Sequence, residues 1–171
     1  MERLDSRTVL DGAPFKVAQA RFRRADGSEV ERQVAEHPGS VAIVAHDDES
    51  VYLVRQPREA VGEDGLLEIP AGTMDVEGES ELECAQRELS EEVDLRAAEW
   101  SELATIYPSP GFLSETVTIF AATSLSPEPG DGDDDEQIEI VRLPLADLDA
   151  ALSEIADAKT LVGLMLLDSL R

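Results

Sequence analysis

The residues best suited to chemistry lie in the run Arg87-Glu88-Leu89-Ser90-Glu91-Glu92. Helical residues three and four positions apart share one face, so a helix here would project Glu88, Glu91 and Glu92 together. Three carboxylates on one face repel one another, and a hard divalent cation such as Mg²⁺ relieves that repulsion because it prefers oxygen ligands. Arg87 could hold one carboxylate by charge-assisted hydrogen bonds. The triplet is typical of a divalent-metal site, but also of a solvated helix face in an acidic protein.

A helix and the turn before it must position these carboxylates. A helix is expected over residues 80–93, because Ser80 and Glu83 have the spacing of a capping box and apolar residues recur along one face. Residues 66–70 are typical of a short strand that leads into a glycine turn at Ala71 and Gly72. The metal hypothesis therefore depends on this stretch folding as strand, turn and helix.

The other segments mix strands and helices, with the strands mostly adjacent in sequence. Asp26 and Gly27 carry a hairpin signal between two N-terminal strands. Strands are expected at residues 8–10, 15–22, 30–35, 41–45, 51–55, 106–107, 116–122 and 138–143, and further helices at 145–155 and 160–170. An acidic loop rich in glycine and proline occupies residues 127–137. This order predicts an α+β fold with a mixed sheet between helices.

Length and composition fit a protein with a full-sized hydrophobic core. The 171 residues are 42% hydrophobic, which suits one domain with a short extension. No apolar run reaches the roughly 20 residues that cross a bilayer, and the first residues lack an apolar signal segment. Cys84 is the only cysteine, which rules out an intramolecular disulfide. We therefore expect a cytoplasmic protein.

The charge balance is strongly acidic. The chain has 38 acidic residues against 14 lysines and arginines, which gives a formal net charge of −24. Such a surface repels phosphate backbones, so we expect neither nucleic acid nor an anionic membrane as a partner. The acids form either a specialised binding face or the general acidic, lysine-poor surface of a halophilic protein. Their spread along the whole chain favours the halophilic interpretation, in which molar salt screens self-repulsion.

A longer pattern around the acidic triplet supports the metal hypothesis. Gly72, Glu79 and residues 87–95 resemble the Nudix box, Gly-x5-Glu-x7-Arg-Glu-U-x-Glu-Glu-x-Gly-U, in which U is aliphatic. The chain departs from this pattern twice: six residues instead of five separate Gly72 from Glu79, and Asp94 stands in place of a glycine. A loop tolerates the insertion, and aspartate is a tolerable left-handed substitute for glycine. Neither change touches the Arg-Glu-x-x-Glu-Glu core.

Flanking segments resemble one branch of that family, the ADP-ribose pyrophosphatases. The resemblance covers roughly residues 8–165 and includes Val-Arg-Gln-Pro-Arg at 54–58, Leu-Glu-Ile-Pro-Ala-Gly at 67–72 and Ser-Pro-Gly-Phe at 109–112. Pro110 lies 16 residues beyond Asp94, the spacing associated with ADP-ribose specificity. The resemblance implies a Nudix-like α/β/α sandwich with a mixed sheet, preceded by N-terminal antiparallel strands. It also implies Mg²⁺-dependent hydrolysis of ADP-ribose to AMP and ribose 5-phosphate.

The resemblance also implies a metal site and the residues that shape it. Mg²⁺, or alternatively Mn²⁺, would be held by the carbonyl of Ala71 and by the carboxylates of Glu88, Glu91 and Glu92. Glu91 would act either as a further ligand or as a positioning group. Arg87 and Glu79 would orient the helix and its carboxylates.

An acid from the late loop would assist the attacking water. Glu136 is the preferred residue, with Asp134 second and Glu139 third, although this loop could equally be a solvated acidic segment. The expected catalytic residues are therefore Glu136, Glu91 and Arg87. Substrate contacts are expected from Arg58, Pro110, Gly111 and Glu115. A surface arginine and a plain turn are the structural alternatives for the residues at 58 and 110–111.

The chain is expected to have two parts and to form a homodimer. Residues 1–36 are expected to form a strand extension that serves dimerisation and completes the partner's substrate site, and residues 37–171 the Nudix hydrolase domain. A nucleotide sugar is the expected small-molecule partner. The alternatives are a Nudix enzyme for another nucleotide sugar, a dinucleotide polyphosphate or an oxidised nucleoside triphosphate, and a silent nucleotide-sensing module. The intact Arg87 to Glu92 core disfavours the silent module.

Overall fold

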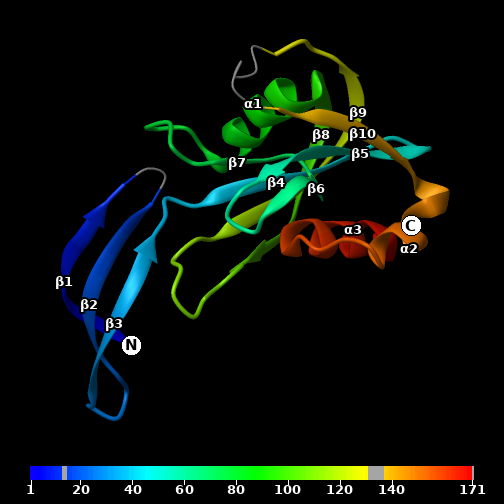
Figure 1. The fold of residues 1–171 in the computed structure, drawn as a ribbon. Coiled ribbons are helices and arrows are strands. Elements are labelled where there is room, and N and C mark those ends of the chain that lie inside the picture. Colours follow the sequence, from blue (N-terminus) through cyan, green and yellow to red (C-terminus); the bar gives the residue numbers. More distant parts are fainter. Residues whose placement is uncertain (13–14, 131–136, 171) are drawn as a thin grey trace. The chain divides into compact units, whose positions relative to one another are not determined.

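The N-terminal strands form a sheet of their own in the computed structural model, which describes residues 1–12, 15–130 and 137–170 (Figure 1). β1 (Glu2–Asp11), β2 (Lys16–Arg23) and β3 (Glu29–Glu36) pair antiparallel in that order. The expected hairpin turn joins β2 to β3. Gly27 adopts a φ of 85° there, and the amide of Ser28 donates to the Asp26 carboxylate over 2.9 Å. The predicted N-terminal antiparallel strands are thus confirmed.

A later loop of the chain joins this sheet. The amide of Ala35 in β3 donates to the carbonyl of Phe112 over 2.8 Å, and the amide of Ser114 donates to the carbonyl of Ala35 over 2.9 Å. Residues 1–39 and 107–116 consequently form one unit, and residues 40–106 with those from 117 onward form a second. The Ser-Pro-Gly-Phe segment belongs to the first unit.

The second unit is built on a mixed sheet. Its main path runs β10-β5-β4-β9-β8, while β6 pairs with β5 and β7 with β4. β4 and β9 are parallel, and the other pairs are antiparallel. The strands are β4 (Ser40–His46), β5 (Ser50–Arg58), β6 (Glu63–Glu68), β7 (Ala71–Thr73), β8 (Leu95–Ile106), β9 (Val117–Pro127) and β10 (Glu139–Pro144). The helices are α1 (Glu81–Val93), η1 (Leu145–Asp147), α2 (Leu148–Leu152) and α3 (Ala158–Leu170).

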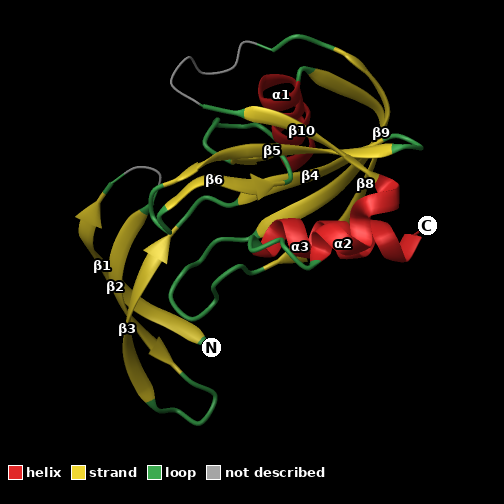
Figure 2. Cartoon of the chain, turned by 45° about the vertical axis from the view of Figure 1, so that its right-hand side comes forward, coloured by secondary structure: helices red, strands yellow, loops and turns green. Residues whose placement is uncertain are grey.

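Helices cover both faces of this sheet (Figure 2). Side chains alternate between the faces of a strand, and β4 shows the consequence. Val41, Ile43 and Ala45 pack in a core with α1, whereas Ala42 and Val44 pack in a second core that contains Leu164 and Leu167 of α3. The second unit is therefore an α/β/α sandwich with a mixed sheet, as predicted.

Helix α1 begins and ends where local chemistry dictates. Both bonds of the predicted capping box are present: Ser80 accepts from the amide of Glu83, and the Glu83 carboxylate accepts from the amide of Ser80. Cys84, Ala85, Leu89 and Val93 form its buried stripe. The helix ends at Asp94, which is left-handed with a φ of 56°. The caps set the two ends of the helix, and the buried stripe is the side that faces the sheet.

One long strand was not predicted. Residues 95–106 form β8, which pairs with β9 along nearly its full length. A strand was expected only at 106–107. Its sequence lacks strict alternation of polar and apolar residues, and its register shifts between Glu102 and Ala104. It ends the path of the sheet, so much of it is exposed and the sequence signal is weak. β7 likewise replaces part of the expected glycine turn.

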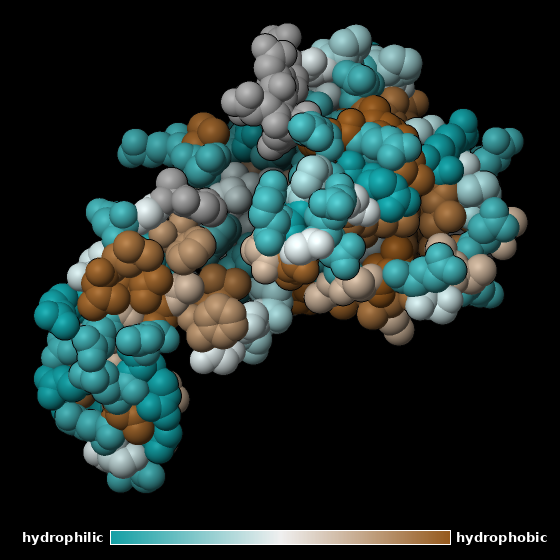
Figure 3. All heavy atoms as spheres, in the orientation of Figure 1, coloured by the Kyte–Doolittle hydropathy of each residue, from teal (hydrophilic) through white to brown (hydrophobic). Residues whose placement is uncertain are grey.

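Hydrophilic residues cover much of the face shown in Figure 3, with apolar residues between them. In the first unit Val9, Leu10, Phe15 and Phe112 are all exposed. Within the described residues no helix is long and apolar enough to cross a membrane.

Candidate active site

Arg87 bonds several carboxylates on α1 and just before it. Its guanidinium donates to Glu79 twice, over 2.9 and 3.1 Å, to Glu88 over 2.7 Å and to Glu91 over 2.8 Å. The Glu79 hydrogen bonds raise the pKa of Arg87 despite its partial burial, and the same bonds hold the pKa of Glu79 below its ordinary value. Arg87 therefore stays charged and offsets the repulsion among these carboxylates.

The turn before the helix receives two of the carboxylates. Glu92 is 7% exposed, and its carboxylate accepts a 3.0 Å hydrogen bond from the amide of Ala71. Gly72 leaves room for Glu88, because a Cβ at position 72 would lie 1.9 Å from the Glu88 carboxyl carbon. Glycine is thus required at position 72 by a close approach, and the side chains of Glu88 and Glu92 lie against the backbone of β7.

The donor chemistry of this place fits a hard divalent cation. Glu88, Glu91 and Glu92 offer carboxylate oxygens from neighbouring turns of α1, beside the backbone of Ala71. Among the residues that the structure describes, no group of three such side chains is gathered closely enough to hold a metal alone. A cation here would complete its coordination with water, backbone or substrate oxygens, as Mg²⁺ commonly does.

Arg58 belongs to a charge network that the sequence did not predict. It forms a bidentate pair with Glu68, from Nε to Oε1 at 2.6 Å and from Nη2 to Oε2 at 2.9 Å, and Lys159 also bonds Glu68. Among the groups that raise the pKa of Arg58, Glu68 is the strongest and Glu92 also contributes. The Arg58 guanidinium is therefore within electrostatic reach of a predicted metal ligand, and its side chain remains 41% exposed.

Sequence reasoning did not assign roles to Glu68 and Lys159. Glu68 is only 1% exposed, and burial by itself would raise its pKa. Arg58 and Lys159 outweigh that effect and hold the pKa of Glu68 below its ordinary value. The sequence feature that could have drawn attention to Lys159 is the rarity of lysine, since the chain has only two lysines. The charge network joins β5, β6 and the first turn of α3.

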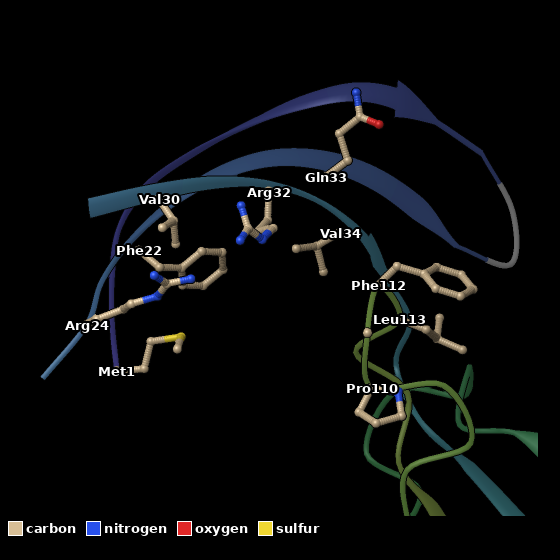
Figure 4. Close-up of a pocket in the computed structure, with 11 residues that line it drawn as sticks. Met1, Phe22, Arg24, Val30, Arg32, Gln33, Val34, Pro110, Phe112 and Leu113 are labelled. Carbon is tan, nitrogen blue, oxygen red and sulfur yellow. The ribbon is translucent and has the colours of Figure 1, made fainter. Parts of the chain in front are cut away.

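The other predicted substrate residues lie in the first unit. Pro110 and Gly111 line a cavity of about 300 Å³ beside the aromatic ring of Phe22 and the guanidinium groups of Arg24 and Arg32 (Figure 4). Met1, Val30, Gln33, Val34, Phe112 and Leu113 complete its lining. The predicted contact Glu115 lies apart from this lining, where its carboxylate is 3.8 Å from Nδ1 of His37.

The three predicted bases lie in two parts of the chain. Glu136 and Asp134 lie outside the described residues. Glu139 is the first residue of β10 and forms a 3.7 Å ion pair with Arg55. Both side chains of that pair are exposed, so Glu139 is held at a solvent-facing strand end.

Comparison with known proteins agrees with this architecture. The family model described as "NUDIX domain" matches residues 36–162. The chain is 42% identical over 125 residues to an ADP-ribose pyrophosphatase of Mycobacterium tuberculosis (strain ATCC 25618 / H37Rv), covering 72% of this chain but 60% of that relative. It is 36% identical over 140 residues to an ADP-ribose pyrophosphatase of Bacillus subtilis (strain 168), covering 79% and 75%.

A solved structure described as an ADP compounds hydrolase superposes with a TM-score of 0.83 at 28% identity, covering 98% of this chain and 92% of that one. The chain belongs to the Nudix family. Within that family it resembles ADP-ribose pyrophosphatases, as the sequence motifs predicted.

The buried carboxylate of Glu68 yields a prediction about pH and stability. Because its pKa is lowered in the folded state, its ion pairs stabilise the fold above the ordinary pKa of 4.5 and are lost as pH falls through the lowered value. We expect Glu68→Gln to lower the free energy of unfolding at pH 7 by about 2–4 kcal/mol, with the deficit shrinking in strong acid. Urea unfolding against pH measures this, with the exposed Glu59→Gln as control. Equal losses in both variants at pH 7 would contradict it.

Proposed function

We propose that this protein hydrolyses the pyrophosphate bond of ADP-ribose, with Mg²⁺ bound at α1, to release AMP and ribose 5-phosphate. The observation that carries the proposal is the packing of the Glu88 and Glu92 side chains against the Ala71–Gly72 backbone. The identity of 42% and 36% to two ADP-ribose pyrophosphatases supports the choice of substrate.

In the proposed mechanism each residue has a separate task. The site would hold the cation through the Ala71 carbonyl and the carboxylates of Glu88, Glu91 and Glu92. The bound cation would supply activation of a water molecule and neutralisation of phosphate charge. Arg87 keeps the carboxylates in place through its bonds to Glu79, Glu88 and Glu91. A side-chain acid, for which we propose Glu136, accepts the proton as the water oxygen bonds to phosphorus. The bond from that phosphorus to the bridging oxygen breaks, and the second phosphate leaves.

Substrate binding is assigned to arginines and to the predicted loop. Arg58 bonds Glu68 through Nε and Nη2, so we assign its Nη1 to a phosphate oxygen. The charge of Glu92 also acts on this guanidinium. We also assign substrate contacts to Pro110, Gly111 and Glu115. The lining of the cavity beside Pro110 supports this assignment, because two guanidinium groups in so acidic a chain favour an anionic ligand.

Product analysis tests the proposed reaction. Purified protein in molar KCl with MgCl₂ is offered ADP-ribose, ADP-glucose, GDP-mannose, diadenosine polyphosphates and 8-oxo-dGTP in parallel. We expect AMP from ADP-ribose to form fastest. Glu92→Gln should lower kcat by about 100-fold or more because a metal ligand is lost, whereas the exposed Glu99→Gln of β8 should behave as wild type.

Each other outcome has a definite meaning. Faster turnover of another substrate would overturn the ADP-ribose assignment and leave the hydrolytic chemistry standing. A Glu92→Gln variant with full activity would refute the metal site. Wild-type protein that turns over none of these compounds would favour a nucleotide-sensing module instead.

We further propose a homodimer that forms through residues 1–36. The exposed apolar side chains of Val9, Leu10 and Phe15 on the first unit suit an interface. Two chains of −24 each repel, so dimer and fold should both require screening by salt. Light scattering in molar KCl should give twice the mass of the 18.5 kDa chain, and the melting temperature should fall as KCl is removed. A monomer in molar KCl would refute the dimer, and a melting curve independent of KCl would refute the salt requirement.

A further inference from the structure

Asp94 breaks two local rules at the end of the metal-site helix. It is left-handed, with φ 56° and ψ 32°, a conformation in which glycine is normally favoured. Its carboxylate also lies at the helix C-terminus, where the helix dipole disfavours negative charge. Both the left-handed backbone and the helix dipole destabilise an aspartate here, so we expect a contact of Asp94 that compensates for them.

That contact is with the residues that follow β9. The amide of Gly130 donates to Oδ1 of Asp94 over 3.3 Å, and the amide of Glu128 donates to the Asp94 carbonyl over 2.9 Å. Ser90, one turn earlier in α1, donates from its hydroxyl to the Glu128 carbonyl over 3.2 Å. These four residues, Ser90, Asp94, Glu128 and Gly130, form what we call the α1–β9 contact.

The α1–β9 contact is tight enough to demand glycine. A Cβ at Gly130 would lie 2.4 Å from the carbonyl oxygen of Ser90 and 2.8 Å from Cα of Glu91. The chain after β9 therefore passes directly against the backbone of Glu91. Because Glu91 and Glu92 are neighbours, displacement at Gly130 would act on two of the proposed metal ligands.

We propose that Asp94 and Gly130 are positioning residues, which hold the last turn of α1 and the chain after β9 in one fixed arrangement. This inference rests on the proposed function, since the carboxylates so positioned are the proposed metal ligands. Asp94 thus replaces the glycine of the Nudix box with a residue that also accepts a hydrogen bond from the chain after β9.

Two substitutions at one position separate the side-chain contact from the backbone geometry. Asp94→Gly restores the favoured left-handed residue but removes the acceptor, whereas Asp94→Asn retains an acceptor oxygen and tolerates the same backbone. We expect Asp94→Gly to lower kcat about 5–10-fold and to raise the Mg²⁺ concentration for half activation, without loss of unfolding free energy. Asp94→Asn should stay within about twofold of wild type. A purely structural role would not reduce kcat while stability is preserved.

Hydrogen exchange of the metal-free protein gives a readout independent of turnover. The amides of Glu128 and Gly130 should exchange about 5–10-fold faster in Asp94→Gly than in wild type, and at the wild-type rate in Asp94→Asn. Gly130→Ala should reproduce the Asp94→Gly kinetics, because its methyl group cannot fit against Ser90. Unchanged exchange and kcat in Asp94→Gly would overturn the inference, even if Glu92→Gln is inactive. Full activity of Glu92→Gln would instead reject the proposed function, while exchange still tests the contact.

Discussion

The repulsion among carboxylates on α1 is the constraint on which the rest of the structure depends. Arg87 offsets it by bonding Glu79, Glu88 and Glu91, and the Ala71 amide bonds Glu92. The helix is held against the sheet by the buried side chains of Cys84, Ala85, Leu89 and Val93. Its capping box and its left-handed end set its length, and Gly72 leaves the space that Glu88 fills. The caps of the helix and its contacts with distant residues therefore both determine where the carboxylates lie.

A second charged network, made of Arg58, Glu68 and Lys159, lies next in sequence to the turn that contacts the α1 carboxylates. Glu68 ends β6, just before the turn that receives the α1 carboxylates, and it bonds both Arg58 and Lys159. The next residue, Ile69, donates its amide to the buried hydroxyl of Thr160 over 2.8 Å. The first turn of α3 therefore anchors the strand from which the glycine turn starts. Arg58 gains a fixed orientation from the same contacts.

Local signals made the helix, the N-terminal hairpin and the acidic cluster predictable, because capping residues, Asp-Gly and helical spacing act within a few positions. The strand β8 escaped prediction because its exposed sequence carries no clear alternation. The pair of Glu68 with Lys159 and the approach of Gly130 to Ser90 join residues 91 and 40 positions apart. Such contacts depend on how distant segments pack together, so no local pattern encodes them. The predicted base Glu136 lies outside the described residues.

The central claim is that α1 and its preceding turn form a divalent-cation site, and Mn²⁺ binding tests it most directly. Metal-free protein in molar KCl is titrated with Mn²⁺, and free Mn²⁺ is followed by electron paramagnetic resonance. We expect saturable Mn²⁺ binding that Mg²⁺ displaces. Binding should weaken strongly in Glu92→Gln and Gly72→Ala and persist in Glu99→Gln. Equal Mn²⁺ binding by wild type and Glu92→Gln would contradict the account, because the acidic surface alone would then explain the bound metal.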